Sequence, residues 1–198
     1  FDGTHAMLGG ICPPVSMGGP SNDVGVVIAT RQSDGNWIPR VDTYSSRMGA
    51  GGWDAGMAII GNPNIRGSAD AIEAGFVRTA TFNGTNWVGA GPSDNGSNTP
   101  TPQGYGYGLS VDQGVLAIAS YRPNTPVIVR RRVGNNFLPE ISLVPSGLIA
   151  ADATQAVAVQ GDRIAIGAPM HTVSVDKQGA AFVFEHRLGV WQQTQRLV

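Results

Sequence analysis

Residues 155–198 read QAVAVQGDRIAIGAPMHTVSVDKQGAAFVFEHRLGVWQQTQRLV. This stretch holds three short apolar runs separated by turn residues, and a fourth run that begins at Trp191. Each run is too short for a helix, and small or β-branched residues recur at every second position, which predicts strands. We therefore expect the C-terminal stretch to form one small antiparallel sheet of four strands.

The rest of the chain repeats this unit at a fixed spacing. In three places a glycine precedes a tryptophan by twelve residues: Gly25 and Trp37, Gly75 and Trp87, and Gly179 and Trp191. Thr125 and Phe137 have the same spacing with other residue types. A second apolar run ending in small residues precedes each pair. A recurring spacing of this kind indicates structural repeats. The expected units, of about fifty residues each within one domain, are 1–44, 45–92, 104–145 and 153–198.

A single four-stranded sheet cannot bury both of its faces, so each unit needs neighbours. Radial repetition of such sheets produces a β-propeller, and we expect an all-β fold of about four blade-like units. A β-sandwich with strands at similar spacing is the alternative. Small residues are expected where the units converge. This predicts that Ala156, Ala158, Ala165 and Ile166 lie on buried strands, with Gly167 close to a neighbouring backbone.

Several segments of the last unit carry a family signature. They are Ala156–Val159, Gly161-Asp162, Ile164–Pro169 (which contains Gly167, Ala168 and Pro169) and Gly179–Phe184, followed by Trp191. Together they resemble an FG-GAP repeat, the blade of integrin-type β-propellers and of many bacterial secreted proteins. The third unit matches the motif at Tyr107–Val111, and the second unit matches it at Gly61–Pro63. The resemblance is therefore strong over roughly 45 residues of the last unit, and in the other units it is weak although their segments stand at the corresponding positions.

The resemblance implies a non-enzymatic binding or scaffolding propeller that presents loops to a protein partner. It also implies an extracellular, periplasmic or cell-surface location, and a ring of more blades than four, usually about seven. A carbohydrate-binding, lectin-like propeller is the alternative, and a hydrolase with its site on the loops is a third possibility. The first unit lacks most of its inner strand, which leaves an open edge. We therefore expect a larger propeller, or a ring completed by another chain, for example two copies forming eight blades.

Metal ions and catalytic groups are not predicted. Integrin-type blades often hold calcium between their first two strands, but the equivalent segments here, Val111–Gly114 and Gln160–Asp162, supply one carboxylate each and are expected to be hairpin turns. His5, His171 and His186 show no paired spacing of the kind that zinc requires. The sequence therefore predicts no metal, no cofactor and no catalytic residue.

Arg130-Arg131-Arg132 is the only run of charges. It fits a solvated strand whose arginine stems cover apolar neighbours, or a patch that binds an anionic partner. The series Trp37, Trp87, Phe137 and Trp191 is expected to open the outer strands and to pack between units, with sugar stacking as the alternative.

Composition limits the possible functions further. The net charge of −1, with only 14% charged residues, implies no general affinity for nucleic acid. No apolar run approaches the roughly 18–20 residues of a membrane span. Cys12 is the only cysteine, so an internal disulfide is impossible. The polar segment 91–103 is expected to be a mobile loop, and 68–74 is the only stretch compatible with a helix.

Overall fold

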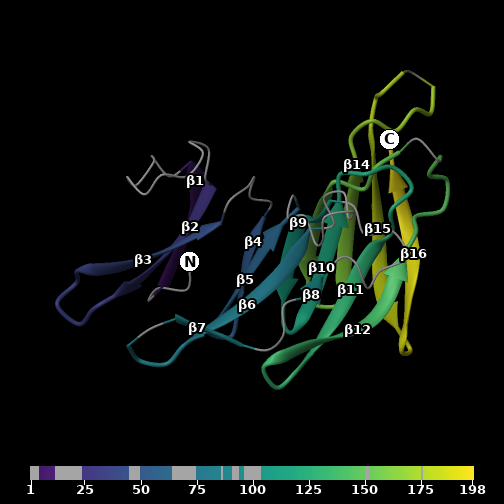
Figure 1. Cartoon of the computed structure of the whole chain (residues 1–198). Coiled ribbons are helices and arrows are strands. Elements are labelled where there is room, and N and C mark those ends of the chain that lie inside the picture. Colours follow the sequence, from purple (N-terminus) through teal and green to yellow (C-terminus); the bar gives the residue numbers. More distant parts are fainter. Residues whose placement is uncertain are drawn as a thin grey trace.

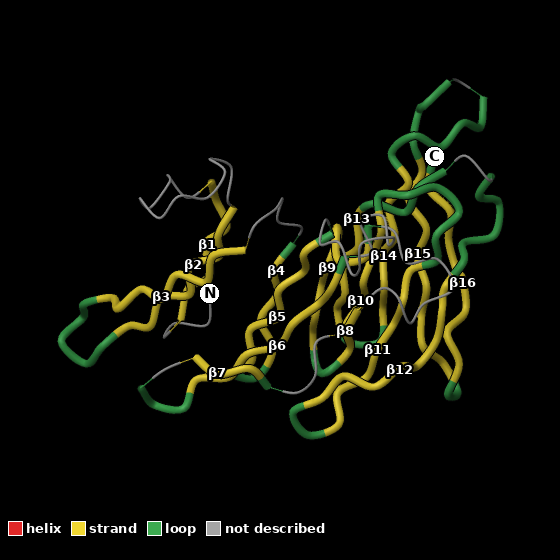
Figure 2. The backbone as a smooth tube through the Cα atoms, viewed as in Figure 1, coloured by secondary structure: helices red, strands yellow, loops and turns green. Residues whose placement is uncertain are grey.

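The computed structural model describes residues 5–11, 24–44, 50–63, 75–85, 87–90, 94–95, 104–149, 152–174 and 176–198. All regular structure in these ranges is β-strand, which confirms the predicted all-β class (Figure 2). The strands form four antiparallel sheets that follow one another in chain order across the molecule (Figure 1). Within the described ranges, nothing forms a helix of the length and apolarity needed to cross a bilayer.

Each sheet is a meander in which strands consecutive in the chain pair with one another, apart from the last strand of the second sheet. The first sheet contains β1 (His5–Ile11), β2 (Val24–Arg31) and β3 (Trp37–Tyr44). The second contains β4 (Gly51–Asp54), β5 (Met57–Asn62), β6 (Phe76–Phe82), β7 (Trp87–Gly89) and β8 (Asp94–Asn95). The third contains β9 (Tyr105–Asp112), β10 (Val115–Ser120), β11 (Val127–Val133) and β12 (Asn136–Leu143). The fourth contains β13 (Ala156–Gln160), β14 (Arg163–Ala168), β15 (Ala180–Arg187) and β16 (Val190–Leu197).

The outer strand of the second sheet departs from the prediction. β7 pairs with Ala80–Phe82 of β6, and β8 then pairs with Phe76-Val77 at the other end of the same strand. The expectation of a loop throughout 91–103 is therefore wrong at Asp94-Asn95, because the pairing with β6 continues beyond the interruption. The helix-compatible stretch 68–74 lies outside the described residues.

Tight turns join the strands where the sequence predicts hairpins. Gln113 and Gly114 both have positive φ, 49° and 77°, between β9 and β10. Two such residues in succession suit the two-residue hairpin turns that match the twist of antiparallel strands. In the β2–β3 turn Gly35 has φ 87°, and Asp34 accepts the backbone N–H of Asn36 at 2.9 Å. This hydrogen bond is the main cause that keeps the pKa of Asp34 below its ordinary value.

The second and fourth sheets approach the third most closely at its first strand, β9, which β5 also contacts. β4 and β13 both lie against β9, on its two sides. The approach requires glycine, because a Cβ on Gly61 would lie 2.3 Å from the carbonyl oxygen of Gly106, and one on Gly108 would lie 2.3 Å from that of Gln155. The four described sheets do not close into a ring (Figure 1).

Three apolar layers fill the spaces between consecutive sheets. We call the face of a sheet that is turned toward the preceding sheet its N-side face, and the opposite face its C-side face. The N-side face of the fourth sheet carries large residues, namely Ile164, Ile166, Phe182, Phe184 and Trp191. The C-side face of the third sheet, against which they pack, carries smaller ones, namely Val115, Ala117, Ala119, Val127 and Val129.

Four residues on the inner strands of the last unit were expected to be buried, and only one of them is. Ile166 is buried on the N-side face, but Ala156, Ala158 and Ala165 are exposed. Successive residues of a strand point to opposite faces, and the three alanines lie on the C-side face, which no described sheet covers. A Cβ on Gly167 would lie 3.2 Å from the Cβ of Ala156 in its own sheet, rather than against a neighbouring sheet.

Candidate functional site

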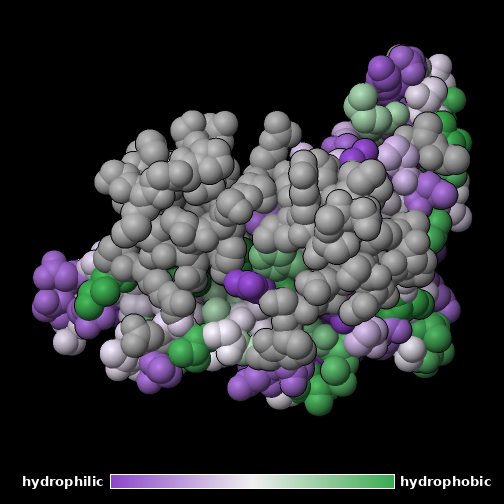
Figure 3. All heavy atoms as spheres, viewed as in Figure 1, coloured by the Kyte–Doolittle hydropathy of each residue, from purple (hydrophilic) through white to green (hydrophobic). Residues whose placement is uncertain are grey.

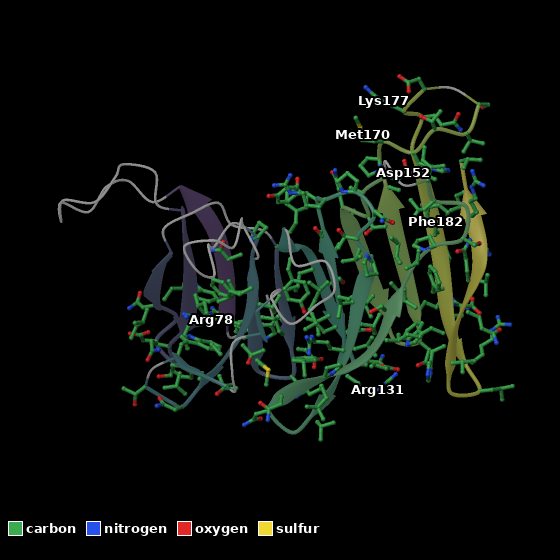
Figure 4. The ribbon with its side chains drawn as sticks, turned by 45° about the vertical axis from the view of Figure 1, so that its right-hand side comes forward. Arg78, Arg131, Asp152, Met170, Lys177 and Phe182 are labelled. Atoms are coloured by element: carbon green, nitrogen blue, oxygen red, sulfur yellow. The ribbon has the colours of Figure 1, made fainter. Side chains whose placement is uncertain are left out.

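Three connections meet at one end of the third and fourth sheets. We call them the loop platform: residues 121–126 between β10 and β11, 144–149 and 152–155 between β12 and β13, and 169–174 with 176–179 between β14 and β15. The β14–β15 connection rises beyond the ends of the strands, with Lys177 at its tip and Met170 near its base (Figures 1 and 4). Figure 3 shows that this projecting part of the surface is largely hydrophilic.

A buried polar cluster lies under the platform. The Nδ1 atom of His171 lies 2.6 Å from Oδ2 of Asp152, and Nη2 of Arg196 lies 3.0 Å from Nε2 of the same ring. His171 is 1% exposed and Asp152 is 4% exposed. Asp152 Oδ2 also accepts the N–H of Ile149 at 2.9 Å. The cluster thus connects the β12–β13 and β14–β15 connections to the last strand.

The partners of His171 determine its tautomer. An arginine can only donate hydrogen bonds, so Nε2 of His171 accepts from Arg196 and Nδ1 carries the proton that it donates to Asp152. The ring also contacts Phe182 edge to face, with centroids 5.9 Å apart. Both ring nitrogens of His171 therefore have partners inside the protein.

The β14–β15 connection is also ordered above its base. The N–H of Gly179 donates to the carbonyl of His171 at 2.9 Å and closes the loop. Nearer the tip, the hydroxyl of Thr172 donates to Asp176 at 3.3 Å and accepts the N–H of Lys177 at 3.0 Å. These hydrogen bonds link the described residues of the loop, 171–174 and 176–179, to one another.

The surface of this loop combines apolar and charged groups. Met170 is 48% exposed and Val173 is 45% exposed, and both lie in the same short segment as the exposed Asp176 and Lys177. Beside the base of the loop is a hollow of about 130 Å³, lined by Asn124, Thr125, Pro126, Val144, Pro145, Leu148, Ile149 and Asp152. Sites for small ligands usually measure about 300–1,000 Å³, so the hollow fits a single inserted side chain better than a sugar chain.

The structure does not gather the three consecutive arginines into one patch. Arg130 is 8% exposed and donates from Nε to the hydroxyl of Tyr105 at 3.1 Å. Arg131 forms two hydrogen bonds of 3.1 Å with Glu140 (Figure 4 labels Arg131). Arg132 pairs with Asp54 of the second sheet at 3.3 Å. An anionic partner would have to compete with these internal contacts, and binding at this run stays a prediction.

The four aromatic residues each stand at or next to the start of the last strand of a sheet, or of β7 in the second sheet. Trp87 is 2% exposed and donates to the hydroxyl of Thr30 in the first sheet at 3.3 Å, while Trp191 is 8% exposed and donates to Glu140 of the third sheet at 3.2 Å. Phe137 is half-buried between the second and third sheets. Trp37 is 40% exposed. The geometry of Trp87 and Trp191 is that of packing between sheets rather than of sugar stacking.

The signature residues of the last unit lead into the platform. Ala168 is buried, and its carbonyl accepts the N–H of His171 at 3.2 Å, while Pro169 is exposed one residue later. The repeat pattern in the sequence identified Ala168 and Pro169 as signature residues, but it did not predict the contacts among Asp152, His171 and Arg196. Nothing in the spacing of the three marks them, because they meet only through two loops and a strand end.

No grouping of three or more histidine, cysteine, aspartate or glutamate side chains able to hold a metal ion occurs in the part of the chain that the structure describes. The two segments compared above with calcium loops are hairpin turns, and Asp112 in the first of them accepts the N–H of Gly161 at 2.7 Å. The absence of calcium in solution stays a prediction.

No protein-family model matches this chain, and no curated protein matches it.

Proposed function

We propose that this chain is a non-enzymatic binding scaffold of the β-propeller type whose loop platform binds a protein partner. The observation that carries the proposal is the contact of the buried His171 with the buried Asp152 and the exposed Arg196, which ties the base of an exposed, internally hydrogen-bonded loop to the sheet below it. A loop that is ordered before binding loses less conformational entropy when a partner arrives. Such a loop on a rigid sheet suits recognition.

The propeller arrangement is part of this proposal. Two observations support it: the close approach of β4 and β13 to the two sides of β9, and the resemblance of the last unit to an FG-GAP repeat. Because of the same resemblance, an extracellular, periplasmic or cell-surface setting is also part of the proposal. In propellers of this kind the connections between strands form the binding face, which is the position of the loop platform.

A protein partner suits the platform better than a sugar. The exposed Met170 and Val173 lie near the charged Asp176 and Lys177, and interfaces between proteins combine apolar contacts with a polar rim. The second candidate, a carbohydrate-binding module, is favoured by one observation, the 40% exposure of Trp37. An enzyme comes third, because His171 has both ring nitrogens engaged in the protein.

The test compares two triple variants of the immobilised chain. The loop variant changes Met170, Val173 and Lys177 to serine, and the control variant makes the matched changes at Val133, Leu138 and Arg187, which lie on strands away from the platform. Extracellular proteins of the source organism are passed over each, and retained proteins are quantified by mass spectrometry. We expect a partner that the wild type and the control retain, and that the loop variant loses by at least about tenfold.

Two results would decide against this proposal. Equal retention of every protein by the loop variant and the wild type would show that the platform is not the binding surface. Binding of the wild type on a glycan array, abolished by Trp37→Ala and unaffected by the loop variant, would establish the carbohydrate-binding alternative instead.

A further inference from the structure

The hollow beside the loop platform combines apolar walls with one buried carboxylate. Pro126, Val144, Pro145 and Leu148 supply the apolar surface, and Asp152 is the only charged residue among the described residues that line the hollow. The volume of about 130 Å³ approaches that of an engineered cavity that holds a benzene molecule. The hollow therefore has room for one long side chain and for little more.

The carboxylate of Asp152 has one oxygen engaged inside the protein and one that is available. Oδ2 accepts the N–H of Ile149 at 2.9 Å and lies 2.6 Å from Nδ1 of His171. Within the described part of the chain, Oδ1 has no hydrogen-bond partner and is not fully enclosed. Since Asp152 lines the hollow, Oδ1 can accept a hydrogen bond from a group that enters it. Figure 4 shows Asp152 below Met170, at the base of the β14–β15 connection.

The charges around the hollow favour a cation inside it. Arg196 does not line the hollow, and it contacts Nε2 of His171, the ring nitrogen that is not paired with Asp152. Its side chain is exposed, and water and salt screen exposed charges, so Arg196 offsets the carboxylate only in part. A carboxylate forms its strongest hydrogen bonds with donors that carry a positive charge. The hollow thus matches an aliphatic stem that ends in a cation.

The single available oxygen favours lysine over arginine. Arginine binds a carboxylate best through two parallel N–H donors, which requires both oxygens. Oδ2 of Asp152 is already engaged with Ile149 and His171. An ammonium group is a compact charge that one oxygen can bind, and the methylene groups of lysine pack readily on apolar surface.

We propose that the hollow binds one lysine side chain of the protein partner. The methylene groups lie against Pro126, Val144 and Leu148, and the ammonium group donates to Oδ1 of Asp152. Val144 and Ile149, which are 66% and 51% exposed, line the hollow and can contact apolar neighbours of the lysine in the partner. This inference rests on the binding function proposed above and specifies the chemistry that the partner presents.

The first experiment titrates the isotope-labelled chain with Nα-acetyl-lysine N-methylamide and follows the backbone amide signals by NMR. We expect saturable shifts at Ile149 and Asp152, with a Kd on the order of 1 mM. The norleucine compound has the same aliphatic stem without the ammonium group. It should bind at least about tenfold more weakly, because it leaves the carboxylate without a donor. The arginine compound should also bind more weakly than the lysine compound.

The second experiment repeats the titration with two variants and their controls. Asp152→Asn keeps an acceptor for the two donors inside the protein and replaces the available oxygen with an NH₂ group, so the affinity for the lysine compound should fall at least about tenfold. Val144→Lys places a competing ammonium group beside the hollow and should weaken binding as well. Asp162→Asn and Val133→Lys make the same changes at exposed positions away from the platform and should bind as the wild type does.

Circular dichroism of each variant establishes that it is folded, and Val144→Lys keeps the test independent of the buried cluster. The proposal is overturned if the wild type gives no saturable shift up to roughly 20 mM of the lysine compound. Equal binding of the norleucine compound, or undiminished binding by both variants, would overturn it as well. A chain that loses its partner through the loop variant but does not bind the lysine compound contradicts this inference alone. If the loop variant retains the same proteins as the wild type, the proposed function fails, and lysine binding that depends on Asp152 would still establish the pocket.

Discussion

The third and fourth sheets carry small apolar residues at the centre of their C-side faces, yet only the face of the third sheet is core. Ala117 and Val129 are completely buried under Ile166 and Phe182, whereas Ala165 is exposed and Val183 is half-exposed. Both pairs follow the same alternation along their strands. The difference shows that a sheet face in this fold is buried only where a neighbouring sheet packs against it. The sequence of one sheet specifies which side chains lie on the face, but not whether the face is covered.

The sharpest way to test that comparison is to place a charge on each of the two faces. Ala117→Asp buries an unpaired carboxylate between sheets and should cost about 4 kcal/mol or more of the free energy of unfolding. Ala165→Asp should change it by less than about 0.5 kcal/mol when the chain is dilute enough to be monomeric. Urea titration of both variants measures the two values. Similar losses at the two positions would show that the fourth sheet's C-side face is covered within one chain.

The tryptophans extend the comparison to the other end of the stack. Trp87→Ala removes a ring that contacts Trp53 and Phe82 at centroid distances of 5.1 and 5.5 Å, and should cost about 3–5 kcal/mol. Trp37→Ala should cost roughly 1 kcal/mol or less, because the ring is partly exposed. Thermal and chemical unfolding measure both. Unchanged stability of the Trp87 variant together with lost sugar binding would instead support a lectin.

A smaller loss of stability is expected from removing a hydrogen bond between the third and fourth sheets. The hydroxyl of Ser110 accepts the N–H of Val159 across the third and fourth sheets at 3.0 Å. Ser110→Ala removes this acceptor and should cost about 1–2 kcal/mol. Ala158→Ser, at the equivalent position of the exposed face, adds a hydroxyl where water is available and should leave stability unchanged. If Ser110→Ala and Ala158→Ser lowered the free energy of unfolding by similar amounts, the conclusion that only one of the two faces is buried would be contradicted.

No effect is expected from removing metal ions. The β9–β10 and β13–β14 turns offer one carboxylate each, and that of Asp112 already accepts the N–H of Gly161. The melting temperature should be the same with and without a chelator of divalent cations. A fall of several degrees on chelation would show that one of these turns, or a part of the chain outside the described residues, binds calcium.

Only those residues of the candidate site that belong to the repeated sequence pattern could be predicted from the sequence. Gly167, Ala168 and Pro169 end an apolar run with turn residues, and they do lead into the β14–β15 connection. Asp152, His171 and Arg196 belong to no common period, since the first two lie in connections and the third near the end of β16. Their contact depends on how two loops fold back over the sheet.

The sequence alone determined the strands, the hairpin turns and the positions of the aromatic residues at the outer strands. Period-two alternation and turn residues act over a few neighbouring positions, so they can be read without knowing the rest of the chain. Only the tertiary structure decided which face of each strand is covered, which partners Arg130, Arg131 and Arg132 find, and that His171 lies buried against Asp152. These outcomes depend on contacts between sheets and loops far apart in sequence, and a residue at an exposed face can have the same local sequence as one in the core.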